Sequence, residues 1–173
     1  MADGTLSLNS GSVLFDFSGN YTSENAMGDV TDAFKFTWRH AITSGTGNNQ
    51  ADRMIRQQTT TAATSTIDLA AGPVPDSHGN TSTFADVSGM AFRNLSTTPG
   101  ENLHIGDKST GGTAFTALFV GATDAIVLHP SGILISTAPL GGYVVGDGSS
   151  DLIYIAAATG TISFEFVIWG HSV

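Results

Sequence analysis

Apolar and polar residues alternate along three stretches of the chain. The apolar positions are residues 13, 15 and 17 in the first stretch, 34, 36 and 38 in the second, and 162, 164, 166 and 168 in the third. A period of two is typical of a β-strand with one buried face. We therefore predict three amphipathic strands, and we expect Trp38 in the core because it shares the phase of Phe34 and Phe36.

Shorter apolar runs, separated by turn residues such as Pro130-Ser131-Gly132 and Gly146-Asp147-Gly148, predict further strands. The stretch 161–169 should be central, because Val167 and Trp169 make its second face partly apolar. About ten short strands with frequent turns favour an all-β fold, an antiparallel jelly-roll-like β-sandwich with little helix. Besides 161–169, the predicted strands are residues 65–69, 87–95, 102–105, 115–120, 125–129, 133–137, 143–145 and 151–156.

The remaining segments are less regular. Residues 24–32 are expected to be a loop with some helical content behind a Ser23 cap. Residues 41–64 are small and polar and are expected to form a long loop, within which residues 50–57 suit either a short helix or an irregular strand. We expect two parts: residues 1–33 as an amino-terminal arm, packed on the sandwich or on a neighbouring subunit, and residues 34–173 as the β-sandwich domain.

Composition excludes several classes of protein. The 173 residues carry 6 Lys and Arg against 15 Asp and Glu, a net charge of -9, which argues against nucleic-acid binding. Cysteine is absent, which removes disulfide scaffolds and Cys-ligated zinc. No apolar window is long enough for a membrane span, and the amino terminus has no secretory signal.

Motifs for chemistry are missing. The five histidines show no His-x-His or His-Glu-x-x-His spacing, so we expect no transition-metal site. No Gly-x-Ser-x-Gly, Ser-x-x-Lys or phosphate-binding glycine pattern occurs, so we predict no enzyme, no catalytic residue and no cofactor. Asp147 and Asp151 are the first pair to inspect for calcium, although Asp also forms ordinary turns.

From residue 51 onward the order of short motifs resembles a group of tailed-bacteriophage and prophage virion proteins with a compact β-sandwich. The resemblance covers about residues 51–171 and leaves residues 1–50 outside it. The group has a Pro-Gly-Gly turn, and this chain departs from it at Ser131 in Pro130-Ser131-Gly132. The motifs in order are Thr66-Ile-Asp-Leu69, Asp76-Ser-His-Gly79, Phe84-Ala-Asp-Val87, Asn94-Leu-Ser96, Leu103-His-Ile-Gly106, Leu128-His-Pro-Ser-Gly132, Gly142-Tyr-Val-Val145, Ser150-Asp-Leu-Ile-Tyr-Ile155 and Phe166-Val-Ile-Trp-Gly170.

The resemblance implies a structural role in a virion, with no active site. We expect a capsid decoration protein that bridges copies of the major capsid protein and forms a homotrimer, with its acidic surface facing away from packaged DNA. Contacts with partners are expected in residues 1–33 and 41–64, outside the sandwich pattern. The interface candidates are Leu6, Leu8, Val13 and Trp169.

Two alternatives stay open. A tail or head-fibre module that binds a receptor or glycan would present exposed aromatic residues, with Trp169, Tyr143 and Tyr154 as candidates. An enzyme such as a glycan lyase or esterase would need a pocket with convergent polar groups, for which the sequence has no motif.

Overall fold

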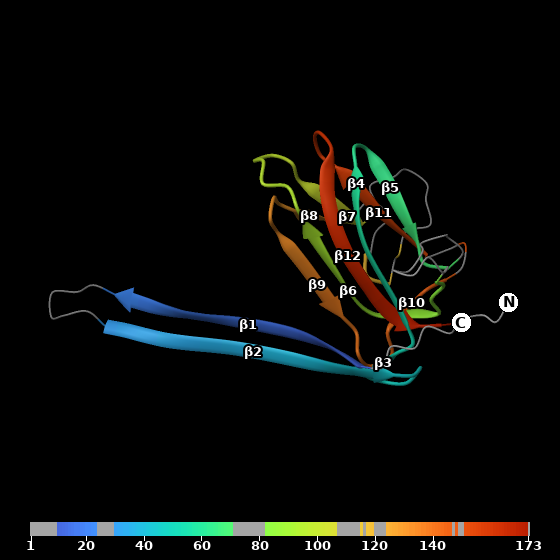
Figure 1. Ribbon diagram of the computed structural model, residues 1–173, viewed down its shortest axis with the longest axis horizontal. Helices are drawn as coiled ribbons and strands as arrows, with labels where there is room; N and C mark the ends of the chain where they lie inside the picture. The colour runs from blue at the N-terminus through green and yellow to red at the C-terminus, as the bar shows by residue number, and fades with distance from the viewer. Residues whose placement is uncertain are drawn as a thin grey trace.

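The computed structural model describes residues 10–23, 30–70, 82–106, 115, 117–119, 124–146, 148 and 151–172. Within these residues it contains twelve strands and no helix, which confirms the predicted all-β class. The strands form an extended hairpin arm and a two-layered body (Figure 1).

The arm consists of β1 (Ser10–Ser23) and β2 (Val30–Ser44), which pair antiparallel without a register shift from Ser10–Thr43 to Ser23–Val30. At about 3.3 Å per residue, 14 paired residues extend roughly 45 Å. The ribbon projects away from the body, to the left in Figure 1. Its base is held by β3 (Gln50–Ala51), which pairs parallel with the end of β2. The boundary expected between residues 33 and 34 falls inside β2.

The body has one sheet of five strands and one of four. The five-stranded sheet holds β4 (Arg53–Thr61), β6 (Asp86–Asn94), β9 (Ile133–Thr137), β10 (Tyr143–Val144) and β12 (Ile162–His171). The four-stranded sheet holds β5 (Thr64–Asp68), β7 (Leu103–Gly106), β8 (Ala125–Leu128) and β11 (Leu152–Ala157).

The strand order of the body is that of a jelly roll. Leaving aside the two-residue β10, the described body strands pair as a long hairpin folded over on itself: β4 with β12, β5 with β11, β6 with β9, and β7 with β8. One sheet is then ordered β4-β12-β6-β9 and the other β5-β11-β7-β8. This arrangement of eight strands in two sheets confirms the jelly-roll-like expectation.

The core lies between the two sheets. Phe92, Phe164 and Phe166 from the five-stranded sheet and Ile105 and Ile155 from the four-stranded sheet are fully buried in one cluster. The inward positions of β12 follow the predicted period of two. Strand β12 pairs with both β4 and β6, so its predicted central place is confirmed.

Asn94 closes one end of this core and is fully buried. Its Nδ2 donates hydrogen bonds to the carbonyl oxygens of Glu101 (2.8 Å) and Leu128 (3.1 Å), and its Oδ1 accepts one from the Ser96 amide (3.0 Å). A buried amide is stable only with such partners. One side chain thus joins β6 to the segments that enter β7 and leave β8.

Other local predictions fail. Residues 41–64 are largely strand, since they contain the end of β2, all of β3 and β4 and the start of β5. Of the two alternatives for residues 50–57, the irregular strand is confirmed, because β3 and β4 contain all of them except Asp52. The extent of β4 was not predicted, because it is an edge strand of mostly polar residues in which only Ile55 and Thr61 are buried. Residues 30–32 belong to β2 rather than a helical loop, whereas residues 24–29 lie outside the described residues.

The segment 115–120 was also expected to be a strand. The described residues there form a turn, in which the amides of Leu118 and Phe119 donate to the Phe115 carbonyl oxygen (both 3.2 Å). Phe115 and Phe119 are both buried in the main core. The strand prediction is wrong here, because Phe115 and Phe119 are both buried by one turn of the chain and not by a strand.

Candidate interaction surface

Trp169 anchors the arm to the body. It lies on the outer face of the five-stranded sheet, is 4% exposed, and forms a second apolar cluster with Ile42 of β2 and Ala51 of β3. Val13 of β1 and Val167 of β12 pack against this cluster. Trp169, an interface candidate, is therefore covered by the base of the chain's own arm, and Val13, another candidate, is half-buried in the same place.

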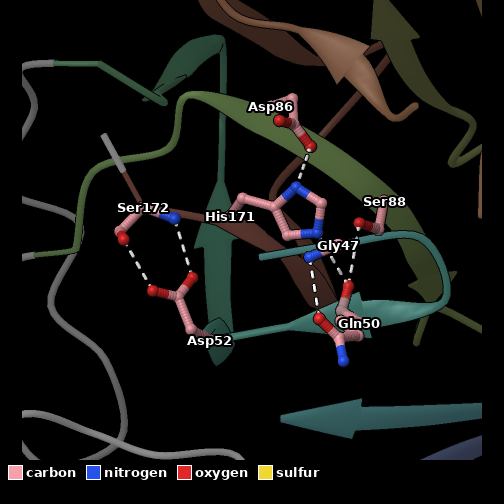
Figure 2. Close-up of polar contacts among 7 residues, drawn as sticks. All are labelled: Gly47, Gln50, Asp52, Asp86, Ser88, His171 and Ser172. Carbon is pink, nitrogen blue, oxygen red and sulfur yellow. Dashed lines mark hydrogen bonds and ion pairs between the residues drawn. The ribbon is translucent and has the colours of Figure 1, made fainter. Parts of the chain in front are cut away.

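A cluster of polar contacts ties β3 to the body (Figure 2). His171 Nδ1 lies 2.8 Å from Asp86 Oδ1, and its Nε2 lies 3.0 Å from the carbonyl oxygen of Gln50. The Ser88 hydroxyl donates to the same carbonyl (3.3 Å). Strands β6 and β12 of the body thus hold Gln50, which pairs with the end of β2.

Further bonds surround this cluster. The Asp52 carboxylate accepts hydrogen bonds from the amide (2.7 Å) and hydroxyl (2.6 Å) of Ser172, and the Asn49 amide donates to the Pro139 carbonyl oxygen (2.8 Å). Gln50 Oε1 accepts from the Gly47 amide (2.8 Å), which shapes the turn between β2 and β3. The base of the arm is therefore fixed by both apolar and polar contacts.

Beyond this base, one face of the arm is apolar and exposed. Register places Val13 opposite His40, Phe15 opposite Trp38 and Phe17 opposite Phe36, so these side chains share a face. The rings of Phe15 and Phe36 meet edge to face at 5.9 Å, and Trp38 stacks on His40 at 5.8 Å. The exposed large residues of this face, here called the arm's aromatic face, are Phe15, Phe17, Phe36 and Trp38.

Trp38 corrects a prediction. It shares the phase of Phe36 as expected, yet it is 36% exposed and Phe36 is 58% exposed. The alternation predicts the strand correctly but not its burial, because among the described residues no second layer covers the outer part of this face of the β1–β2 ribbon.

The opposite face of the arm is mostly polar. Lys35 Nζ lies 3.6 Å from Asp16 Oδ2, and the Thr37 hydroxyl donates to Asp16 Oδ1 (3.4 Å). Both partners of the ion pair are exposed to solvent, so it stabilises the arm little. Leu14 is the exposed apolar residue on this side. The ribbon therefore has one apolar face and one mostly polar face, as does a sheet that buries one side.

Strand β9 continues the apolar surface onto the body. Ile133 and Ile135 lie on its outer face and are 60% and 41% exposed. Together with Phe15, Phe36 and Trp38 they line an open groove of about 650 Å³ between the arm and β9. A contiguous exposed apolar surface of this kind is typical of a binding site. Sequence reasoning placed strand 133–137 correctly but gave its isoleucines no role.

Of the other candidate residues, the structure describes Asp151. Leu6, Leu8 and Asp147 lie outside the described residues. Asp151 is buried, and its Oδ2 accepts a hydrogen bond from the Gly148 amide (3.0 Å), an ordinary turn contact. Within the described residues, no group of three or more His, Asp or Glu side chains is placed to hold a metal ion.

The aromatic residues proposed for glycan binding are dispersed. Tyr143 is half-buried against Phe115, and its hydroxyl lies 2.8 Å from that of Ser136. Trp169 is covered by the arm, and Tyr154 is half-buried on β11. The exposed aromatic cluster is instead on the arm, in a segment that the sequence resemblance leaves out.

No protein-family model matches the chain, and no curated protein matches it. No helix among the described residues has the length and hydropathy needed to cross a membrane.

Proposed function

We propose that this protein is a structural subunit of a bacteriophage particle, and in its most specific form a capsid decoration protein that bridges neighbouring subunits of the head. The observation that carries the proposal is the arm, which exposes an aromatic face outside a body whose own core is complete. Such a face costs solubility and contributes nothing to the body. It is useful when another protein surface covers it.

The energetics favour docking of a protein surface. Each of the four rings of the arm's aromatic face is roughly half exposed, so covering one removes about 100 Å² from water. At about 25 cal/mol per Å² this contributes about 2.5 kcal/mol for each ring, before the entropy cost of association. Four rings on one ribbon together contribute about 10 kcal/mol before that cost, which favours a protein surface as the occupant.

The fold gives support by analogy. Jelly rolls occur widely in viral capsid and lectin domains, and fold by itself does not decide function. The resemblance over residues 51–171 covers the body, while the arm lies outside it. A jelly-roll body that carries a separate arm suits a subunit whose partner contacts are specific to its own particle.

Binding to particle heads tests the proposal. The double variant Phe15→Ser/Phe36→Ser should lose cosedimentation with heads of the phage or prophage that encodes the chain. The matched control is Leu140→Ser, which removes an even more exposed apolar side chain (72%) from the turn after β9. The control should bind as the unaltered protein does. Equal binding by all three proteins, or binding by none, would refute the proposal.

A receptor- or glycan-binding module of a tail or head fibre is the second candidate. The observation in its favour is the groove lined by Phe15, Phe36 and Trp38. Small-ligand sites also carry convergent polar groups. The polar residues lining this groove among the described ones are Thr137 and Asp16, and the Asp16 side chain lies on the opposite face of the arm. Binding of the unaltered protein to a glycan array, together with its loss in Trp38→Ala, would favour this candidate over the first.

A further inference from the structure

We infer that the arm's aromatic face docks on a second copy of this chain, apolar face against apolar face, so that the arm is a self-association element. The inference deepens the proposed function and rests on it in one respect, the assignment of the arm as the docking element. It names the protein that covers the aromatic face, which is another copy of this chain.

The first argument is continuity with a contact inside the chain. At its base the apolar face of the arm is already covered by a β-sheet surface, where Val13 and Ile42 pack with Trp169. The same face continues outward without cover, and exposure rises from 36% at Trp38 to 58% at Phe36. The uncovered part has the chemistry of the covered part, so a β-sheet surface of the same kind suits it.

The second argument is length. The arm extends roughly 45 Å, whereas the five residues of β9 span only about 17 Å. The body can therefore cover only part of the arm. An isolated two-stranded ribbon is marginally stable in water, and a second layer on its apolar face is the usual remedy.

The third argument is charge. With a net charge of -9, two copies repel each other over most of their surface. Among residues 11–18 and 35–42, the aromatic face carries no Asp, Glu, Lys or Arg, because Asp16, Lys35 and Arg39 all point to the other side. This face is where a second acidic copy can approach at the least electrostatic cost.

The fourth argument is area. The aromatic face together with Ile133 and Ile135 presents six large apolar side chains that are roughly half exposed. Covering them removes about 600 Å² per copy, or about 1,200 Å² for a pair, which is the lower end of stable protein interfaces. The surface is thus large enough for self-association of moderate strength.

Light scattering after gel filtration tests the inference. The unaltered protein should have a mass at least twice the 17.8 kDa of one chain. The Phe15→Ser/Phe36→Ser variant should be a monomer, and Leu140→Ser should match the unaltered protein. Thermal unfolding checks that both variants retain the folded body. A monomeric unaltered protein, or a double variant that remains associated, would overturn the inference.

A spin label gives an independent measurement. The chain has no cysteine, so Ser18→Cys, on the polar face of the arm, carries a single label per copy. Dipolar coupling can then arise only between copies, and it should vanish when Phe15→Ser/Phe36→Ser is added. Absence of coupling in the labelled protein would count against arm-to-arm packing.

Salt and head binding separate this inference from the proposed function. Because the copies are acidic, added salt should strengthen self-association, while it would weaken docking on a basic partner. A monomer that binds heads through its arm would overturn the inference and leave the proposed function intact. Self-association through the arm without head binding would uphold the inference and overturn the proposed function.

Discussion

The indole of Trp169 on β12 lies directly over Gly89, its cross-strand neighbour on β6. A Cβ atom built on Gly89 would overlap the six-membered ring of the indole. Glycine at this position therefore makes room for the tryptophan, and the tryptophan in turn supports Ile42 and Ala51 at the base of the arm. The attachment of the arm therefore depends on glycine at position 89 of the neighbouring strand β6.

Gly89→Ala should destabilise the protein by about 2 kcal/mol, because the added methyl group forces the indole from its place. The free energy of unfolding in denaturant measures this. A double-mutant cycle with Trp169→Leu identifies the cause, since the penalty should shrink when the large ring is absent. An equal penalty in both backgrounds would mean that the collision with Trp169 is not responsible.

Loss of the His171 contacts should loosen the arm before it unfolds the body. His171→Ala removes the contacts with Asp86 and with the Gln50 carbonyl oxygen, at a cost of about 1–3 kcal/mol. Hydrogen exchange should become faster at residues 50 and 51 and stay slow in β12. His129→Ala serves as the control, because that histidine is exposed and its Nδ1 lies 3.0 Å from Asn102 Oδ1, away from the base of the arm.

Asn94→Asp should be among the most damaging isosteric substitutions. It replaces an amide that donates to two carbonyl oxygens by a carboxylate oxygen that cannot donate, in a fully buried position, with an expected cost of about 3 kcal/mol or more. The matched change Asn102→Asp keeps the acceptor that faces His129 and should cost under about 1 kcal/mol. Similar losses for both variants would contradict the role given to Asn94.

The two tryptophans should report on different parts of the account. In a Trp38→Phe variant, Trp169 should emit at short wavelength and resist acrylamide, because it is buried. In a Trp169→Phe variant, Trp38 should be readily quenched in the Phe15→Ser/Phe36→Ser monomer and protected where copies associate. Unchanged quenching of Trp38 on association would show that the aromatic face is not the contact.

The body was predictable from sequence because its burial follows strand phase. Ile162, Phe164 and Phe166 alternate with outward residues, and the pairing partners of β12 cover the inward side. Strand β4 could not be found in this way. Its residues are mostly polar, and it becomes a strand through backbone bonds to β12 rather than through its own apolar side chains.

The arm shows the limit of alternation more clearly. Phe36 and Trp38 follow the same period as Phe164 and Phe166, yet the first pair is exposed and the second buried. Period two reports which side chains share a face, and it carries no information on whether another layer covers that face. The candidate surface thus emerged from the pairing of β1 with β2 and from the outer face of β9.

A reconstruction of the whole particle tests the central claim most directly. The account predicts jelly-roll density on the outside of the head, with the ribbon of residues 10–44 lying on neighbouring protein and its Phe15, Phe36 and Trp38 face covered. A particle that lacks this protein, or one in which the ribbon extends into solvent with that face bare, would contradict the account.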